Sequence, residues 1–302
     1  MTDTTESLNR MKIIAGIGEI VWDIFPDGQP RLGGAPANFV YYSQLLGTES
    51  LLISRIGDDE LGKETLYLLA QADLNQEYIQ IDPFHPTGTV RVSLDAAAVP
   101  TFFIEENVAW DYLEKSPNLR QLASKVNAIC FGSLAFRSSQ SRETLNWFLS
   151  GLRADCLRIL DINLRPPFFS KDLIEYLFTQ ANVLKINETE LGLIKSLFSF
   201  REREEKDILK KLLHLYNFKL IALTKGEKGS LLLSGNRECH HPGFPVKAID
   251  TVGAGDAFTA ALVHGLLKGM DLEEINRRAN WLASYVCTQK GAWVKLENKI
   301  LS

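Results

Sequence analysis

The sequence predicts a three-layer α/β fold, in which helices cover both faces of a mostly parallel central sheet and a small β-sheet lies apart. Short, wholly apolar runs recur in the second half of the chain, which is typical of strands buried on both faces. Helical patterns separate these runs, as βαβ crossovers require. Residues near 88–104 alternate between apolar and polar, which indicates half-exposed strands outside the main sheet.

Strands and helices of the first half follow from local patterns. The strands are expected at Lys12–Ile17, Val21–Phe25, Leu51–Ile56, Thr87–Leu94 and Thr101–Ile104. The helices are expected at Ala37–Leu46 and Leu61–Ala70.

The second half alternates strand and helix more regularly. Its buried strands are expected at Ala128–Phe131, Leu157–Leu160, Val183–Ile186 and Leu220–Leu223. Its helices are expected at Ser141–Leu149, Leu173–Thr179, Glu204–Leu215, Ala257–Leu267 and Leu272–Gln289. The charged run Arg201–Lys206 fits the solvated first turn of a helix.

Composition restricts the partners and the compartment. Of the 302 residues, 45% are hydrophobic, and the net charge is −4, without the basic excess of a general nucleic-acid binder. No stretch approaches the roughly 18 apolar residues of a membrane span. Residues 1–10 are polar and lack a signal-peptide core, so we expect a disordered tail followed by one domain over residues 11–302. The four scattered cysteines indicate buried thiols in a reducing cytoplasm.

Two glycine-containing segments nearly match familiar phosphate-binding motifs. Gly16-Ile17-Gly18 follows a strand, but Val21 stands where a dinucleotide fingerprint needs its third glycine. Gly57–Lys63 has Walker A spacing, yet Glu64 replaces the hydroxyl that binds Mg²⁺, and three acidic residues in the loop would repel a triphosphate. We reject both as phosphate sites.

A stronger candidate is Gly253-Ala254-Gly255-Asp256. Glycines on either side of a small residue let successive N–H groups point inward as an anion-binding nest. The following apolar helix adds the positive end of its dipole. Asp256 could then accept the proton of an attacking hydroxyl during phosphoryl transfer. Equally, Asp256 could cap the helix and the glycines could form a tight turn, and the local sequence leaves both readings open.

Asp250–Asp256 resembles the second signature of the ribokinase-like (PfkB) carbohydrate kinases, and Gly33-Gly34-Ala35-Pro36-Ala37-Asn38 with Leu45-Leu46-Gly47 resembles the first. Further similar segments follow in the family's order: Ile56–Gly62, Asp161-x-Asn163-x-Arg165, Asn187-x-x-Glu190 and Thr224-x-Gly226-x-x-Gly229. The resemblance extends from about Lys12 to Lys295. It implies a ribokinase-like fold and an ATP-dependent sugar kinase, a phosphotransferase acting on an alcohol group.

The resemblance implies roles for residues on the nucleotide side. Asp256 would be the general base, with Gly253, Ala254 and Gly255 as the anion hole. Asn187 and Glu190 would position Mg²⁺ and the ATP phosphates through water, and Lys185 would add positive charge. Thr224, Gly226, Gly229 and Asn280 would line the nucleotide site. Asp250 and Thr251 match positions that hold a monovalent cation, so K⁺ is a hypothesis.

On the acceptor side, Asp23, Asn38, Gly33 and Gly34 match ligands of sugar hydroxyls. Arg165, in the Asp161-x-Asn163-x-Arg165 pattern, is similar to an arginine of sugar kinases that act on fructose or keto-sugar acids. Gly18-Glu19 followed by Asp23 and Pro26 resembles the N-terminus of fructokinases, which implies a fructokinase-like enzyme. A 2-keto-3-deoxygluconate kinase or another sugar or nucleoside kinase of the family is the alternative. A non-catalytic sugar- or nucleotide-binding regulatory homologue would be expected to lose Asp256 or the glycines, which are present.

The resemblance also implies a lid, formed by strands near 21–32 and 88–104, that closes over the sugar and excludes water. Unpaired lid edges suggest a homodimer through the lid. Two departures from the family pattern are Val40, after the first signature, and Ala96-Ala97-Ala98, in place of a glycine-rich lid turn. Cys239-His240-His241 fits a polar strand edge better than a metal site. We expect a cytoplasmic enzyme whose partners are a sugar and ATP, without nucleic acid or membrane.

Overall fold

The computed structural model describes residues 12–26, 28–94 and 100–296. Within this part of the chain, a nine-stranded sheet has the order β13-β12-β11-β10-β9-β8-β1-β4-β5, in which the β11–β12 and β12–β13 pairs are antiparallel and the other pairs are parallel. Its strands are β1 (Ile13–Ile17), β4 (Glu49–Gly57), β5 (Ile79–Asp82), β8 (Ala128–Phe131), β9 (Leu157–Asp161), β10 (Val183–Asn187), β11 (Leu220–Thr224), β12 (Ser230–Ser234) and β13 (Arg237–His241).

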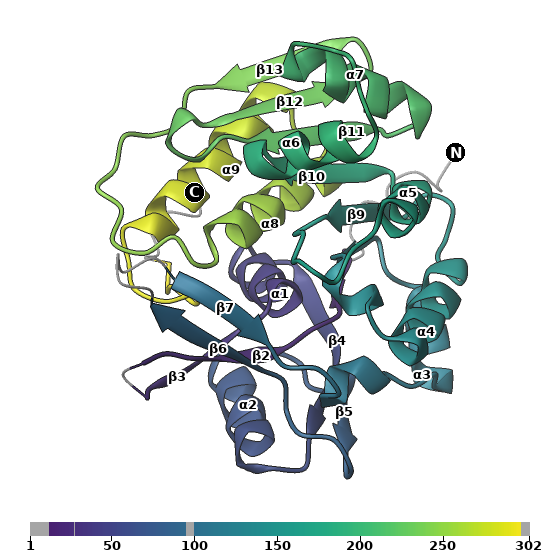
Figure 1. Ribbon diagram of the computed structural model, residues 1–302, viewed down its shortest axis with the longest axis vertical. Helices are drawn as coiled ribbons and strands as arrows, with labels where there is room; N and C mark the ends of the chain where they lie inside the picture. The colour runs from purple at the N-terminus through teal and green to yellow at the C-terminus, as the bar shows by residue number, and fades with distance from the viewer. Residues whose placement is uncertain (1–11, 27, 95–99, 297–302) are drawn as a thin grey trace, which may run out of the picture.

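Helices cover both faces of this sheet, so the predicted three layers are confirmed (Figure 1). One face packs against α1 (Ala35–Leu45), α2 (Glu60–Gln71), α8 (Ala254–Leu267) and α9 (Leu272–Cys287). The other packs against α3 (Pro117–Ala123), α4 (Ser139–Ser150), α5 (Lys171–Gln180), α6 (Glu188–Leu197) and α7 (Glu205–Leu215). Along β8, Ile129 and Phe131 enter one core while Ala128 and Cys130 enter the other, which explains the uninterrupted apolar run.

A separate four-stranded sheet has the order β3-β2-β6-β7. Its strands are β2 (Val21–Ile24), β3 (Pro30–Gly33), β6 (Thr89–Leu94) and β7 (Pro100–Ile104). In Figure 1 this sheet lies below α1, away from β10–β13. An apolar cluster of its own, which contains Val21, Val90 and Trp110, supports it. The predicted small sheet is therefore present.

The turn before β6 is held to the start of α2 by Asp59. Its carboxylate caps α2 by accepting from the Gly62 N–H at 2.8 Å and also accepts from the Thr87 N–H at 2.8 Å and hydroxyl at 2.7 Å. The segment with Walker-like spacing therefore joins the main domain to the small sheet.

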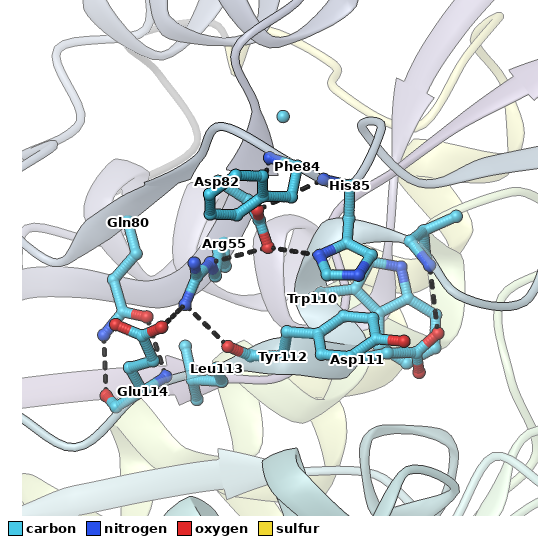
Figure 2. Close-up of polar contacts among 12 residues, drawn as sticks. Arg55, Gln80, Asp82, Phe84, His85, Trp110, Asp111, Tyr112, Leu113 and Glu114 are labelled. Carbon is cyan, nitrogen blue, oxygen red and sulfur yellow. Dashed lines mark hydrogen bonds and ion pairs between the residues drawn. The ribbon is translucent and has the colours of Figure 1, made fainter.

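Both ends of the β6–β7 hairpin meet the main sheet in a polar network (Figure 2). Arg55, in β4, lies with its Nε 3.1 Å from the Asp82 carboxylate, and its Nη1 contacts Glu114 and the Tyr112 carbonyl, each at 2.7 Å. His85 bonds to Asp82 at 2.9 Å and stacks on the Tyr112 ring, with centroids 3.6 Å apart. These contacts fix the roots of the hairpin rather than its strands.

Most predicted elements are confirmed with shifts of one or two residues at their ends. Four observed elements, β5, β12, α3 and α6, were not expected from the sequence. The prediction for Arg201–Lys206 is largely wrong, because α7 begins at Glu205 and most of the run precedes it. Cys239-His240-His241 lies in β13 at the sheet edge, as expected. The tail at residues 1–10 and the Ala96-Ala97-Ala98 turn lie outside the described residues.

The cysteines are free thiols, of which Cys130, Cys156 and Cys239 are buried and Cys287 is partly buried. In the described ranges, none of the helices has the length and apolar character needed to cross a membrane.

Candidate active site

The predicted anion hole lies at the N-terminus of α8. Gly253 is the N-cap residue and adopts a left-handed conformation, with φ 80° and ψ −10°. A Cβ there would lie 2.8 Å from the Ala292 carbonyl oxygen, so both conformation and space require glycine. Because this N-cap has no side chain to accept hydrogen bonds, the first-turn N–H groups of α8 can donate hydrogen bonds to an anion.

Asp256 lies in that first turn and meets a residue of the first signature. The Asn38 Nδ2 group donates to Asp256 Oδ2 at 2.8 Å, although the two residues are 218 positions apart. Burial raises the pKa of the Asp256 carboxyl to about 7, and the nearby Asp161 carboxylate adds to the rise. Asp256 therefore combines a position beside the anion hole with proton affinity suited to a general base near neutral pH.

A buried ion pair lies behind the anion hole. Lys185 Nζ, on β10, is 2.9 Å from Asp161 Oδ1 on β9, and Thr259 in α8 donates to Asp161 Oδ2 at 2.9 Å. The same ammonium would be 3.1 Å from a Cβ at Gly255. Burial would lower the pKa of Lys185, but the surrounding carboxylates outweigh burial and raise it, so the side chain stays charged. Gly255 thus lets a permanent positive charge approach the first turn of α8.

Asn187 and Glu190 form a reciprocal cap at the start of α6. Asn187 Oδ1 accepts from the Glu190 N–H, and Glu190 Oε2 accepts from the Asn187 N–H, both at 2.9 Å. Glu190 Oε1 also accepts from the Leu164 N–H at 3.1 Å. Burial raises the pKa of the Glu190 carboxyl. Each oxygen retains lone pairs, so the carboxylate remains able to orient metal-bound water.

The predicted acceptor side has charged groups around Asp23. Burial raises the pKa of Asp23 to about 6, while Arg165 and Arg31 draw it downward. A Cβ at Gly33 would lie 3.3 Å from Asp23 Oδ2, so glycine leaves that carboxylate room. Arg165 also lowers the pKa of Asp256 and of Glu19, which places its charge near all three carboxyl groups.

Glu19 is a buried acid that the site predictions omitted. It is 4% exposed, and its Oε2 has no hydrogen-bond partner in the described part of the chain. Burial raises the pKa of Glu19 to about 7, partly offset by Arg165 and Arg137. Gly34, with φ 108°, passes so close that a Cβ would be 2.6 Å from the Glu19 carbonyl. The first signature therefore packs its glycine directly on the Gly18-Glu19 turn.

The Ala109-Trp110-Asp111 segment, which had no role in the sequence analysis, holds Arg137. Asp111 accepts from Arg137 through both carboxylate oxygens, at 2.8 and 2.7 Å. The guanidinium carbon lies 4.0 Å from the centre of the Trp110 ring and 4.7 Å from that of Phe168. These contacts join the segment after β7 to Arg137 and Phe168 of the main domain.

The predicted nucleotide loop follows β11. Gly226 (φ 56°) faces open space, whereas a Cβ at Gly229 (φ 80°) would lie 2.0 Å from the His241 carbonyl oxygen. Thr224 donates to the Ile186 carbonyl at 3.5 Å. Asn280 Nδ2 donates to Ser230 Oγ at 2.7 Å and to Asn276, so its amide nitrogen is hydrogen-bonded within the protein interior. Gly229 is thus explained by packing, and Gly226 is the open glycine of this loop.

The predicted cation loop is closed by Asp250. Its Oδ1 accepts from the Val252 N–H and its Oδ2 from the Gly291 N–H, both at 3.0 Å. Thr251 is exposed between them. The loop predicted to hold a monovalent cation therefore lies against Gly291.

The structure adds Asp161, Thr259, Glu19 and Trp293 to the residues expected from sequence. Lys185 and Asp161 face each other in the parallel register of β9 and β10. The sequence signal that could have found this pair is a charged residue near the carboxyl end of each of two mostly apolar strands. Trp293 donates from Nε1 to Asn38 Oδ1 at 2.9 Å, and no sequence pattern indicates that contact.

Comparisons with known proteins agree with this geometry. Residues 25–299 match the family described as pfkB family carbohydrate kinase. A fructokinase of Klebsiella pneumoniae is 31% identical over 264 residues, covering 83% of each chain. The ATP complex of an uncharacterised sugar kinase from Pyrococcus horikoshii is 28% identical with a TM-score of 0.79, covering 93% of this chain and 94% of that one. A Vibrio cholerae fructokinase double mutant, with fructose, ADP and potassium bound, is 25% identical with a TM-score of 0.79, covering 94% of each chain. With this match over most of its length, the chain belongs to the pfkB family of carbohydrate kinases and is a sugar kinase.

Proposed function

We propose that the protein transfers the γ-phosphoryl group of ATP to a hydroxyl of fructose, with Asp256 as general base. The observation that carries this proposal is the Asn38–Asp256 hydrogen bond of 2.8 Å, because it brings the acceptor-side signature to the base beside the anion hole. Asp256 removes the hydroxyl proton as the new phosphorus–oxygen bond forms. The first-turn amides of α8 stabilise the charge that develops on the phosphoryl oxygens.

The acceptor is bound by Asp23, Asn38, Arg165 and the backbone at Gly33 and Gly34. A carboxylate and an amide can each bond hydroxyls of a polyol. Similarity to fructokinases supports fructose as the acceptor. A 2-keto-3-deoxygluconate kinase is the alternative, and it would use the Arg165 guanidinium to bind the substrate carboxylate.

The nucleotide is bound between the loop after β11 and the N-terminus of α8. Lys185 fits this role because its buried ammonium lies beside Gly255. Glu190 with Asn187 fits an indirect Mg²⁺ contact, since Mg²⁺ keeps much of its water. Thr224 and Gly226 line the loop, and Gly229 shapes it. The amide nitrogen of Asn280 bonds within the protein, so its carbonyl oxygen is the atom that would contact the adenine ring of ATP.

K⁺ is proposed beside Asp250 and Thr251. The similar fructokinase with potassium bound supports this choice. So does the hydrogen bond from Gly291 to Asp250, which brings the two loops to one place. The cation would support the anion-hole loop and would not take part in proton transfer. Equal turnover in K⁺ and in Na⁺ would contradict the proposed K⁺ requirement.

The small sheet serves as the lid, and a homodimer through the lid is proposed from its edges. β7 is an edge strand, and its Phe102 and Phe103 side chains are each 55% exposed. Sedimentation velocity of Phe102→Ser should show loss of the dimer, whereas Phe84→Ser, at an exposed residue outside the lid strands, should not. Free cysteines fit a cytoplasmic location for this enzyme.

A coupled ADP-release assay across fructose, ribose, 2-keto-3-deoxygluconate and adenosine tests the acceptor. The highest kcat/KM is expected for fructose. Preference for the keto-acid would instead establish the alternative substrate. Turnover with none of these acceptors, together with tight sugar binding, would favour a non-catalytic regulatory homologue.

A further inference from the structure

We propose that Trp293 is a positioning residue for phosphoryl transfer: its indole N–H fixes the orientation of the Asn38 amide, and Asn38 in turn orients the Asp256 carboxylate. This inference rests on the proposed role of Asp256. Trp293 lies 255 residues from Asn38 in the sequence, after the last helix, and belongs to none of the signatures.

The chemistry of the indole determines which way the Asn38 amide points. An indole nitrogen is only a donor, so the group 2.9 Å from Trp293 Nε1 must be the acceptor oxygen of Asn38. The Nδ2 group of Asn38 then faces Asp256 Oδ2, at 2.8 Å. A reversed amide would place a carbonyl oxygen against the carboxylate and leave the indole N–H facing an amino group. Asn38 is 4% exposed, so water cannot easily replace either partner.

The chain around Trp293 is held firmly by α1. The Trp293 ring stacks on Tyr41, with centroids 4.8 Å apart and planes inclined by 6°. On either side, the Tyr42 hydroxyl donates to the Ala292 carbonyl at 2.6 Å and accepts from the Val294 N–H at 3.3 Å. Tyr41 and Tyr42 follow Asn38 by three and four positions on α1, so both lie on the same face of the helix as Asn38. The indole thus reaches Asn38 from a segment with little freedom to move.

The same segment touches the anion hole. The Ala292 carbonyl oxygen occupies the space that a Cβ of Gly253 would need. One short stretch of chain therefore packs against the N-cap of α8 and orients the acid in its first turn. Charged and titratable groups from other elements also act on that acid: Asp161 from β9, Lys185 from β10, Arg165 from the loop after β9, Glu19 after β1 and Tyr42 from α1.

Trp293→Phe tests the proposal because it keeps the stack on Tyr41 and removes the N–H. At pH 7 we expect kcat to fall about fivefold to tenfold, the effect of one net hydrogen bond. The acidic limb of kcat/KM against pH should move up by roughly half a unit, because the freed amide can turn its oxygen toward Asp256. Trp147→Phe, in α4 on the opposite face of the sheet, is the matched control and should match wild type. An unchanged limb and kcat in Trp293→Phe would overturn the proposal.

A double-mutant cycle separates action through Asn38 from a general effect on packing. Trp293→Phe added to Asn38→Ala should cause no further loss, and full additivity would contradict the proposal. Asn38→Asp gives an independent check that does not depend on the stability of Trp293→Phe. Its carboxylate should move the acidic limb of kcat/KM to higher pH, and an unmoved limb would contradict the action of Asn38 on Asp256. Asp256→Asn is measured beside these variants. Near-normal turnover there rejects the proposed base itself, whereas an inactive Asp256→Asn with a normal Trp293→Phe rejects only the role of Trp293.

Discussion

Lys185 and Asp161 form a buried ion pair, at 2.9 Å, directly behind the first turn of α8. The parallel register of β9 and β10 places the two residues side by side. Thr259 satisfies the second carboxylate oxygen, at 2.9 Å. Because Asp161 also raises the pKa of Asp256, this pair connects the stability of the sheet with the chemistry of the site.

Lys185→Met should be strongly destabilising. The variant leaves the Asp161 carboxylate buried without its counter-charge, which typically costs about 3–5 kcal/mol of the free energy of unfolding. The matched control is Lys206→Met, since Lys206 pairs with Glu238 on the surface, where both side chains are more than 40% exposed. Lys206→Met should lower the free energy of unfolding by about 1 kcal/mol at most. Urea denaturation measures both, and equal losses would contradict the importance assigned to the buried pair.

Gly255→Ala should damage catalysis more than folding. The new Cβ would lie 3.1 Å from Lys185 Nζ, so the ammonium must shift away from the anion hole. We expect roughly a tenfold fall in kcat/KM for ATP, equivalent to about 1.4 kcal/mol. Gly192→Ala, in α6, is the control because its Cβ meets nothing within 4 Å. That variant should keep full activity and gain up to about 1 kcal/mol of stability. A normal kcat/KM in Gly255→Ala would show that the ammonium does not act there.

The activity should fall on the acidic side of neutrality. Burial raises the pKa of Asp256 to about 7, so below that pH the folded enzyme carries a protonated base that cannot accept the hydroxyl proton. The midpoint of the acidic limb in kcat/KM against pH is therefore expected near 7. A profile that stays flat down to pH 5 would contradict the proposed base.

Glu19→Gln should stabilise the protein in mildly alkaline solution. Burial raises the pKa of Glu19 from 4.5 to about 7, so the folded state binds its proton more tightly than the unfolded state does. The associated stability is present at low pH and is lost as pH rises through about 7. We therefore compare the free energy of unfolding of Glu19→Gln with that of wild type at two pH values. The difference should favour the variant more at pH 8 than at pH 5, by at most about 3 kcal/mol. Glu64→Gln, on the exposed face of α2, should show no such dependence.

The fold was largely predictable because buried parallel strands are apolar throughout. Ala128–Phe131 was expected and observed with the same bounds. By contrast, β12 and β13 form an antiparallel edge whose apolar–polar alternation is weak, so β12 was not expected from the sequence. Helix α6 was also missed, although Asn187 and Glu190 have the spacing of a capping box and mark its start.

The chemistry of the site was less predictable than its position. Local motifs pointed to α8 and to Asn38, but they did not show that Asn38 donates to Asp256. That contact, like the one from Trp293 to Asn38, joins residues more than 200 positions apart and depends on how α1, α8 and the C-terminal segment pack. Glu19 could not be recognised as a buried acid until the fold showed what covers it.

The most direct test of the account is kcat of Asp256→Asn in the coupled ADP-release assay with the preferred sugar. The amide keeps the size of the side chain but cannot accept the proton. We therefore expect kcat to fall by roughly 10² to 10⁴, while ATP binding measured by titration calorimetry stays close to wild type. A variant that keeps near-normal kcat would contradict the assignment of Asp256 as the base.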